Sequence, residues 1–214
     1  MTAGALQSFA RLVTLEGGEG AGKSTVLDAL RGELETQGYE VLCTREPGGT
    51  PLAEMIRELL LNPAHEPPSP QAELLLMFAS RAQHVRETVL PALERGDWVL
   101  SDRFTDSSFA YQGGGRGLDE GFIAELERRV VGIRPGLTLL LDVPIAEGRA
   151  RANGREREAD RIERERDEFF ERARATFLAR AAAEPARFRV VDATRPAAAV
   201  AAEAVELLRG YQAS

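Results

Sequence analysis

The sequence has few of the features that would tie a protein to a membrane or to an oxidising compartment. Its single cysteine, Cys43, excludes an internal disulfide. No stretch approaches the roughly 18 unbroken apolar residues of a membrane-spanning helix. The first ten residues lack the basic and then apolar pattern of a signal peptide. Together these absences predict a cytoplasmic protein without a membrane partner.

Net positive charge is also lacking. Asp and Glu number 34 against 27 Lys and Arg, which gives a net charge of -7. This excess of acid argues against a protein whose main work is binding the backbone of nucleic acids. It does not exclude a small anionic ligand, because such a ligand is held by local charge. The length and an apolar content of 43% predict one domain, residues 1–214, that buries a core.

Lysine is nearly absent, because Lys23 is the only lysine among the 27 basic residues. It lies in GGEGAGKS, residues 17–24, which matches the phosphate-binding pattern G-x-x-x-x-G-K-[ST]. In such a loop, backbone N–H groups and a helix N-terminus face phosphate oxygens. A slender ammonium fits inside the loop, whereas the broad guanidinium of arginine does not. The octet therefore predicts a P-loop that binds ATP or GTP.

Apolar runs alternate with helix-like segments along the chain. The runs predict five strands, at residues 11–16, 39–45, 97–102, 137–143 and 188–193. The segments between them predict helices, at residues 23–37, 51–61, 71–94, 119–132 and 162–184. Because the runs are almost continuously apolar, we expect an α/β P-loop NTPase fold with a five-stranded parallel sheet and helices on both faces. Ligands bind such sheets at the carboxyl ends of the strands, which here carry Gly17, Arg45, Asp102, Asp142 and Asp192.

Three segments interrupt this alternation. NPAHEPPSP, residues 62–70, is rich in proline and is expected to be irregular. QGGGRG, residues 112–117, has too many glycines for a regular element. Residues 149–166 hold seven Arg and five Asp or Glu, a mixture as typical of a solvated helix face as of a binding segment.

Six motifs follow one another in the order EGGEGAGKST, TREPGGT, LMFASRAQ, DRF, AYQGGGRG and DRIE. With this set the sequence resembles the thymidylate kinases of the bacterial type over nearly its whole length. The resemblance implies that MgATP and dTMP give ADP and dTDP, which feeds dTTP synthesis. It also implies ATP as co-substrate, Mg²⁺ as cofactor and a homodimer.

The resemblance and the motif together place the donor nucleotide on the P-loop. The residues implied to bind ATP are Gly17, Gly18, Gly20, Ala21, Gly22, Lys23, Ser24 and Thr25. Lys23 reaches the β- and γ-phosphates, and Ser24 places its hydroxyl on Mg²⁺. Asp102 acts either through Mg²⁺ or its water shell or by orienting Arg103, and these roles stay open. DATRP, residues 192–196, resembles the loop beside adenine.

The resemblance also implies a dTMP site, made of Glu19, Arg45, Phe78, Arg81, Arg103, Ser108, Tyr111 and Gln112. Arg45 and Arg103 hold the phosphate, because guanidinium suits bidentate binding of phosphate oxygens. Phe78 stacks on thymine, and Arg81, which only donates, bonds thymine O4 but not the amino group of cytosine. By resemblance, Tyr111 lies against the sugar, Ser108 and Gln112 border the base, and Glu19 lies near the sugar 3′-hydroxyl.

The acceptor needs no general base, because a phosphate monoester with a second pKa of about 6 is mostly dianionic at pH 7. We therefore interpret His65 and His84 as surface or packing residues. By resemblance, a lid at approximately residues 149–162 supplies the catalytic arginine, because Gly20 stands where the other type of the family has arginine. The lid offers Arg149, Arg151, Arg155 and Arg157, of which Arg155 is favoured, then Arg151. The implied catalytic set is Glu19, Lys23, Asp102, Arg103, Arg151 and Arg155.

Two other functions stay open. One is a kinase of another pyrimidine nucleotide such as dUMP or dCMP, against which Phe78, Arg81 and Tyr111 argue. The other is a non-catalytic ATP-binding subunit, which intact Lys23, Ser24 and Asp102 disfavour.

The helix expected at residues 71–94 carries a broad apolar stripe that includes Leu74, Leu75, Met77, Val85 and Leu93. One sheet face is not expected to cover it all, which favours self-association.

Overall fold

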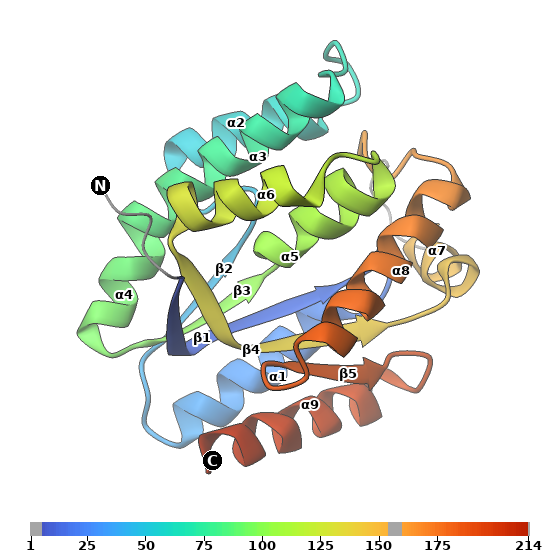
Figure 1. Ribbon diagram of the computed structural model, residues 1–214. Helices are drawn as coiled ribbons and strands as arrows, with labels where there is room; N and C mark the ends of the chain where they lie inside the picture. Colours follow the sequence, from blue (N-terminus) through green and yellow to red (C-terminus); the bar gives the residue numbers. More distant parts are fainter. Residues whose placement is uncertain (1–5, 154–159, 214) are drawn as a thin grey trace.

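A parallel β-sheet forms the centre of the computed structural model, which describes residues 6–153 and 160–213 (Figure 1). Within these residues five strands lie in the order β2-β3-β1-β4-β5, and every neighbouring pair is parallel. The strands are β1 (Gln7–Gly17), β2 (Val41–Arg45), β3 (Trp98–Asp102), β4 (Ile133–Asp142) and β5 (Phe188–Asp192). The predicted five-stranded parallel sheet is confirmed.

Helices cover both faces of this sheet, because successive side chains of each strand point to opposite faces. In β1, Val13 and Leu15 pack on one face and Leu12 on the other, and all three are fully buried. Helices α1 (Lys23–Thr36) and α9 (Ala197–Gln212) cover the first face. The second face lies against α3 (Pro70–His84), α4 (Leu90–Arg95), α6 (Glu120–Leu126) and α8 (Asp167–Ala183).

The remaining helical segments complete the connections. They are α2 (Pro51–Leu61), α5 (Thr105–Ser108), α7 (Ile145–Asn153) and the π-helical segments η1 (Val85–Val89), η2 (Phe109–Gly115) and η3 (Glu127–Val131). Residues 62–69 are irregular, as the prolines predict, and Pro70 opens α3. No helix of the described ranges has the length and apolar character needed to cross a membrane.

Strands β1 and β4 are longer than the sequence predicts. Gln7–Phe9 of β1 pair with Ile133–Pro135 of β4, and the register between the strands shifts between Phe9 and Val13. The first part of β1 is mostly exposed, so it is not continuously apolar and the sequence pattern does not mark it as strand. The carboxyl ends lie where they are predicted, since the strands end at Gly17, Arg45, Asp102, Asp142 and Asp192.

The glycine-rich segment at residues 112–117 is not irregular, contrary to the prediction. Its first four residues belong to η2, and the glycines serve packing against α8. A Cβ on Gly114 would lie 2.1 Å from the Thr176 hydroxyl oxygen, and a Cβ on Gly115 would lie 2.4 Å from the Phe169 ring. Glycine is used here because two helices meet at backbone distance.

The apolar stripe of residues 71–94 is mostly covered within the chain. Leu74, Met77 and Val85 are buried, and only Leu75 is half exposed. The stripe is therefore not covered in full, as expected, and its exposed part is Leu75. Exposed apolar side chains also lie on one face of α2, at Leu52, Met55 and Leu59.

Candidate active site

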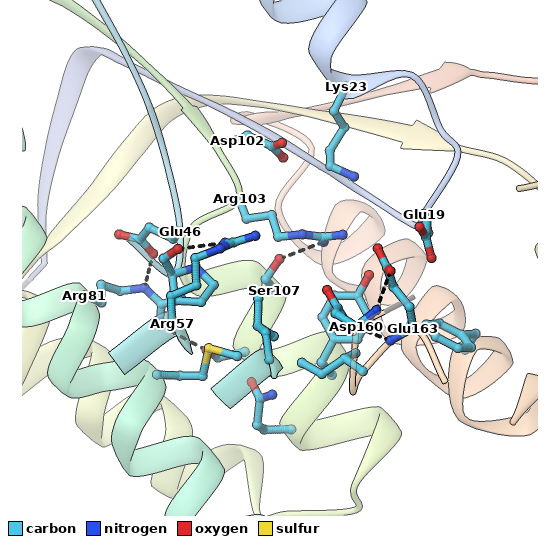
Figure 2. A pocket seen from close by; sticks show the side chains of 18 of the residues that line it. Glu19, Lys23, Glu46, Arg57, Arg81, Asp102, Arg103, Ser107, Asp160 and Glu163 are labelled. Carbon is cyan, nitrogen blue, oxygen red and sulfur yellow. Dashed lines mark hydrogen bonds and ion pairs between the residues drawn. The ribbon is translucent and has the colours of Figure 1, made fainter. Parts of the chain in front are cut away.

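A cavity opens at the carboxyl edge of the sheet, where the polar strand ends meet. Its empty volume is about 1030 Å³, including the part that is open to solvent. It is lined by the P-loop, the turn after β3, helices α2, α3 and η2, and the segment 160–163. Figure 2 shows Lys23 and Asp102 on the same side of Arg103. A pocket with convergent polar groups at the carboxyl edge of a parallel sheet is the usual place for a ligand.

The P-loop lies directly against the start of α7. Gly20 takes a left-handed conformation with φ 71°, and a Cβ there would lie 2.0 Å from the Gly148 carbonyl oxygen. Conversely, a Cβ on Gly148 would lie 2.5 Å from the Glu19 carbonyl oxygen. Only glycine fits at both positions. The phosphate loop and the helix that begins the Arg-rich segment therefore touch backbone to backbone.

Lys23 lies inside the P-loop. Its Nζ donates to the carbonyl oxygens of Gly17 at 3.3 Å and Gly18 at 3.0 Å. Burial, and then the nearby charge of Arg103, lowers the pKa of Lys23 to about 8. A pKa lowered for these reasons means that the surroundings disfavour the ammonium. An anion in the cavity offsets this cost, so the electrostatics here favour a phosphate ligand.

Arg103 lies in the turn after β3 with a left-handed backbone, φ 73°. The hydroxyl of Ser101 donates to the carbonyl oxygen of Arg103 at 2.7 Å and supports this uncommon conformation. The guanidinium donates from Nη1 to the carbonyl oxygen of Gly17 at 3.1 Å and to the hydroxyl of Ser107 at 3.2 Å. Its Cζ lies 5.0 Å from the centre of the Tyr111 ring. The turn thus directs one cation at the P-loop from the adjacent strand.

Glu16 supports this turn, although no sequence motif assigns it a role. It is fully buried, and its Oε1 accepts from the backbone N–H groups of Phe104 at 2.8 Å and Ser107 at 3.2 Å. Its Oε2 accepts from the Ser107 hydroxyl at 2.6 Å. Burial, and then the charge of Asp106, raises the pKa of Glu16 to about 7. In the sequence Glu16 ends an apolar run and opens the motif EGGEGAGKST, which gives it no role of its own.

The raised pKa of Glu16 predicts a pH dependence of stability. The pKa is about 7 in the folded protein, against 4.5 for an unperturbed glutamate, so the folded state holds this proton more tightly than the unfolded state. The stabilising contribution is complete below pH 4.5 and is lost as the pH rises to about 7. We expect the free energy of unfolding of the wild type to fall relative to Glu16→Gln over this range. Urea unfolding at a series of pH values measures the difference, and a difference independent of pH would contradict the prediction.

Asp102 and Ser24 form the candidate metal position. Oδ1 of Asp102 is buried, and it has no hydrogen-bond partner in the described part of the chain. Both residues line the main cavity and also a neighbouring recess beside α1 and β2. Carboxylate and hydroxyl oxygens are hard donors that suit Mg²⁺, which proteins commonly bind through one or two carboxylates and substrate phosphates. The donor atoms therefore fit this ion.

Arg81 is held on three sides. Its Nε donates to Glu46 at 2.5 Å, its Nη1 to the hydroxyl of Ser108 at 3.0 Å and its Nη2 to the carbonyl oxygen of Phe104 at 3.0 Å. Only 3% of Arg81 is exposed, and it lines the cavity. Because every nitrogen is held, the planar guanidinium presents its remaining N–H groups in a fixed direction.

Glu46 is itself held by His84. His84 Nδ1 lies 3.0 Å from Oε1 of Glu46, and His84 Nε2 lies 2.7 Å from the hydroxyl oxygen of Thr44. His84 is fully buried, so it is not a surface residue, and besides packing it orients the carboxylate that holds Arg81. His65 lies at the surface, 3.7 Å from Glu58. No local pattern indicates that Glu46 and His84 form a network, because they lie 38 residues apart.

On α3, Met77 rather than Phe78 reaches the cavity. Phe78 is 2% exposed in the core beside Leu74, and it is not among the residues that line the cavity. Its ring lies 4.9 Å from Cζ of Arg81. Met77 lines the cavity four residues before Arg81, hence on the same helix face. The stacking role of Phe78 stays a prediction, which this packing does not favour.

Arg45 ends β2 but does not enter the cavity. It pairs with Glu54 at 3.1 Å and faces the neighbouring recess. Arg57 of α2 lines the cavity instead, and its Nη1 donates to the carbonyl oxygen of Pro47 at 2.8 Å. Burial, and then the charge of Arg45, lowers the pKa of Arg57. Arg57 could not be identified from the sequence, because nothing in the pattern shows how α2 is oriented.

The predicted lid is only partly described. Arg155 and Arg157 lie outside the described residues. Arg151 donates to the carbonyl oxygens of Ala193 at 2.6 Å and Thr194 at 3.0 Å, and it pairs with Glu147 at 2.5 Å. It therefore contacts the loop after β5 and is not among the residues that line the cavity.

The predicted site residues in the described part of the chain fall into two groups, according to whether they line the cavity. Those that line the cavity are Glu19, Gly20, Gly22, Lys23, Ser24, Arg81, Asp102, Arg103, Ser108, Tyr111 and Gln112. Those that do not line it are Gly17, Gly18, Ala21, Thr25, Arg45, Phe78 and Arg151. The cavity is also lined by residues without a predicted role, among them Glu46, Arg57, Met77, Ser107, Asp160 and Glu163. The motifs TREPGGT, LMFASRAQ and DRIE contain four of these six, so the motifs marked the right segments but not these side chains.

Known proteins resemble this chain over most of its length. A family model described as thymidylate kinase matches residues 15–204. A thymidylate kinase of Chromohalobacter salexigens is 58% identical over 194 residues, which are 90% of this chain and 92% of the relative. One of Alcanivorax borkumensis is 52% identical over 95% of this chain and 98% of the relative. The crystal structure of thymidylate kinase from Ehrlichia chaffeensis is 31% identical and has a TM-score of 0.75, over 92% of this chain and 97% of that one.

Proposed function

The chain belongs to the thymidylate kinase family and transfers a phosphoryl group from ATP to dTMP, and we propose that it does so in line between two phosphates held by separate cations. The observation that carries this proposal is the position of Arg103. Its guanidinium bonds the Gly17 carbonyl of the P-loop and also lines the cavity beside Arg57. One cation thus lies between the loop for the donor phosphates and the pocket for the acceptor.

On the donor side, we assign the ATP phosphates to the P-loop, residues 17–24, and to Lys23. Ser24 and Asp102 would hold Mg²⁺, which neutralises phosphate charge when it is bound. Arg151 supports the adenine side through the loop at Ala193 and Thr194. Arg155 keeps the proposed role of the cation that stabilises charge on the transferred group. In this proposal residues 1–214 act as one kinase domain with a lid at about residues 149–162.

On the acceptor side, we assign the dTMP phosphate to Arg103 and Arg57, with Arg57 in place of Arg45. The dianionic phosphate attacks without a general base, so positioning and charge neutralisation supply the catalysis. Arg81 donates toward thymine O4, and leaving its fixed N–H groups unpaired against cytosine costs about 1–3 kcal/mol. Met77 packs against the base, and Tyr111, Ser108, Gln112 and Glu19 border the base and sugar.

A matched pair of arginine variants tests this assignment. We expect Arg57→Ala to raise KM for dTMP by about 10- to 100-fold, because a hydrogen-bonded charge pair with the acceptor phosphate is lost. We expect Arg45→Ala to change it by less than about twofold, because only a surface pair with Glu54 is removed. Steady-state kinetics with dTMP as the varied substrate measures both. Equal effects of the two changes, or a larger effect of Arg45→Ala, would instead assign the dTMP phosphate to Arg45 at the end of β2.

We also propose a homodimer that forms through α2. Leu52, Met55 and Leu59 are 45%, 60% and 51% exposed and lie on one helix face, and Leu75 of α3 is 50% exposed. An apolar stripe of this kind favours association with a second copy. Light scattering would then report a particle of about twice the 23.3 kDa chain mass. A cytoplasmic location completes the proposal, and the lone Cys43 supports it.

A further inference from the structure

Glu73 is a buried carboxylate to which the mechanism assigns no role. It lies in the first turn of α3 and is 1% exposed. Its Oε1 accepts from Gln112 Nε2 at 2.9 Å and from Arg116 Nε at 3.3 Å. Its Oε2 accepts from Arg116 Nη2 at 3.0 Å and from Arg161 Nη2 at 2.6 Å. One carboxylate therefore joins α3, η2 and the segment 160–163.

Through Gln112, Glu73 contacts the pocket proposed for the base. Gln112 is 1% exposed and lines the cavity beside Ser108 and Tyr111. Because its amide nitrogen donates to Glu73, the rotamer and the orientation of the amide are fixed. A glutamine that has lost this partner can rotate, and its contact with a base is then no longer directional.

A second set of contacts links Glu73 to segment 160–163, which lines another part of the cavity. Besides Glu73, Arg161 bonds the end of α2, with its Nε donating to the Leu60 carbonyl at 2.7 Å and its backbone N–H to the Leu61 carbonyl at 2.9 Å. Its neighbours Asp160 and Glu163 accept from each other's backbone N–H at 2.9 and 2.8 Å and line the cavity. Arg161 itself does not line it. Its side chain therefore fixes a cavity wall from behind.

The charges of this cluster balance. Arg116 and Arg161 face Glu73, and Arg116 also pairs with Glu165 at 2.6 Å. Burial opposes ionisation of Glu73, but hydrogen bonds from Arg116 and Gln112 outweigh it and lower its pKa. Removal of this anion takes away the partner that the two guanidinium groups share, which is costly in a buried setting.

We propose that Glu73 is a positioning residue that holds the base pocket and segment 160–163 in a fixed relative position. Replacing Arg161, which contacts Glu73 outside the cavity, then alters the affinity for dTMP. This rests on the proposed placement of dTMP. It predicts coupling between Gln112 and Arg161, whose side chains are linked through the carboxylate of Glu73.

The test measures dTMP binding by titration calorimetry, together with kcat and KM. We expect Arg161→Ala to weaken dTMP binding by about fivefold or more, although Arg161 lies outside the cavity. In a Gln112→Ala or Glu73→Gln background, the same change should weaken it by less than about twofold, because the link is already broken. Arg166→Ala is the matched control, an exposed arginine five residues away, and should leave binding unchanged.

Three outcomes would overturn the proposal. They are unchanged dTMP affinity in Arg161→Ala, equal losses from Arg161→Ala in all backgrounds, and a fall in melting temperature as the only effect. If Glu73→Gln does not fold, Gln112→Ala and Arg161→Ala still complete the cycle. Wild-type protein that binds no dTMP would refute the proposed function instead, which separates the two failures.

Discussion

Replacing Lys23 by arginine is expected to lower kcat by about 10²- to 10³-fold, the usual cost of removing one preorganised group that stabilises transition-state charge. The ammonium lies between the Gly17 and Gly18 carbonyl oxygens, inside a loop that is closed on its outer side by Gly148. A guanidinium keeps the charge but is wider and planar, so it displaces the loop or leaves the cavity. Steady-state kinetics with circular dichroism as a folding control measures the effect. Activity of Lys23→Arg within tenfold of the wild type would contradict it.

The same residue offers a chemical control, because it is the only lysine in the chain. Its pKa of about 8 leaves a substantial fraction as free amine at mildly alkaline pH, which amine-selective reagents attack. We expect acetylation of one side chain to abolish activity, and MgATP to protect against it. Mass spectrometry after digestion counts the modified sites. Inactivation that MgATP does not slow would argue against a place for Lys23 beside the donor phosphates.

Asp106→Ala is expected to reduce the free energy of unfolding by about 3–5 kcal/mol, the cost of breaking a buried ion pair from one side. Asp106 is fully buried, and Arg187 donates to its two oxygens at 2.7 and 2.8 Å. Arg180 Nε donates to Oδ1 at 2.7 Å. These bonds tie α5, which follows the Arg103 turn, to α8 and to the residue before β5. Without Asp106, two arginines lose their main anionic partner.

An aspartate that pairs with an exposed arginine provides the control for this change. Asp97 pairs with the exposed Arg95 at 2.8 Å, and we expect Asp97→Ala to cost no more than about 1 kcal/mol. Urea unfolding of both variants gives the comparison. Similar losses at the two sites would mean that burial adds nothing to the Asp106 pair. Because Asp106 also raises the pKa of Glu16, its loss should lower that pKa and weaken the pH dependence of stability.

The sequence predicts the sheet well, because parallel strands buried on both faces must be apolar along their length. It also predicts the polar residues at the strand ends, since Arg45 and Asp102 each directly end such a run. It fails where the direction of a side chain decides the outcome. Arg45 ends its strand as predicted, yet it pairs with Glu54 and points into the neighbouring recess.

Helical phase explains two further differences. A broad apolar stripe around LLLMF does not show which residue faces the core, and the structure buries Phe78 and turns Met77 to the cavity. Arg57 has no motif of its own, because its position depends on how α2 lies over the sheet edge. Glu16, Glu73 and His84 act through partners at least 38 residues away in sequence. No local pattern marks such pairs.

The contact between Gly20 and Gly148 limits how this enzyme can vary. Neither glycine has room for a methyl group. A Cβ on Gly20 would meet the main chain of Gly148, and a Cβ on Gly148 would meet the main chain of Glu19, next to Gly20. Enlarging one position cannot be compensated by shrinking the other, because nothing smaller than hydrogen exists there. A library randomised at both codons and selected for activity should therefore return the parental pair alone.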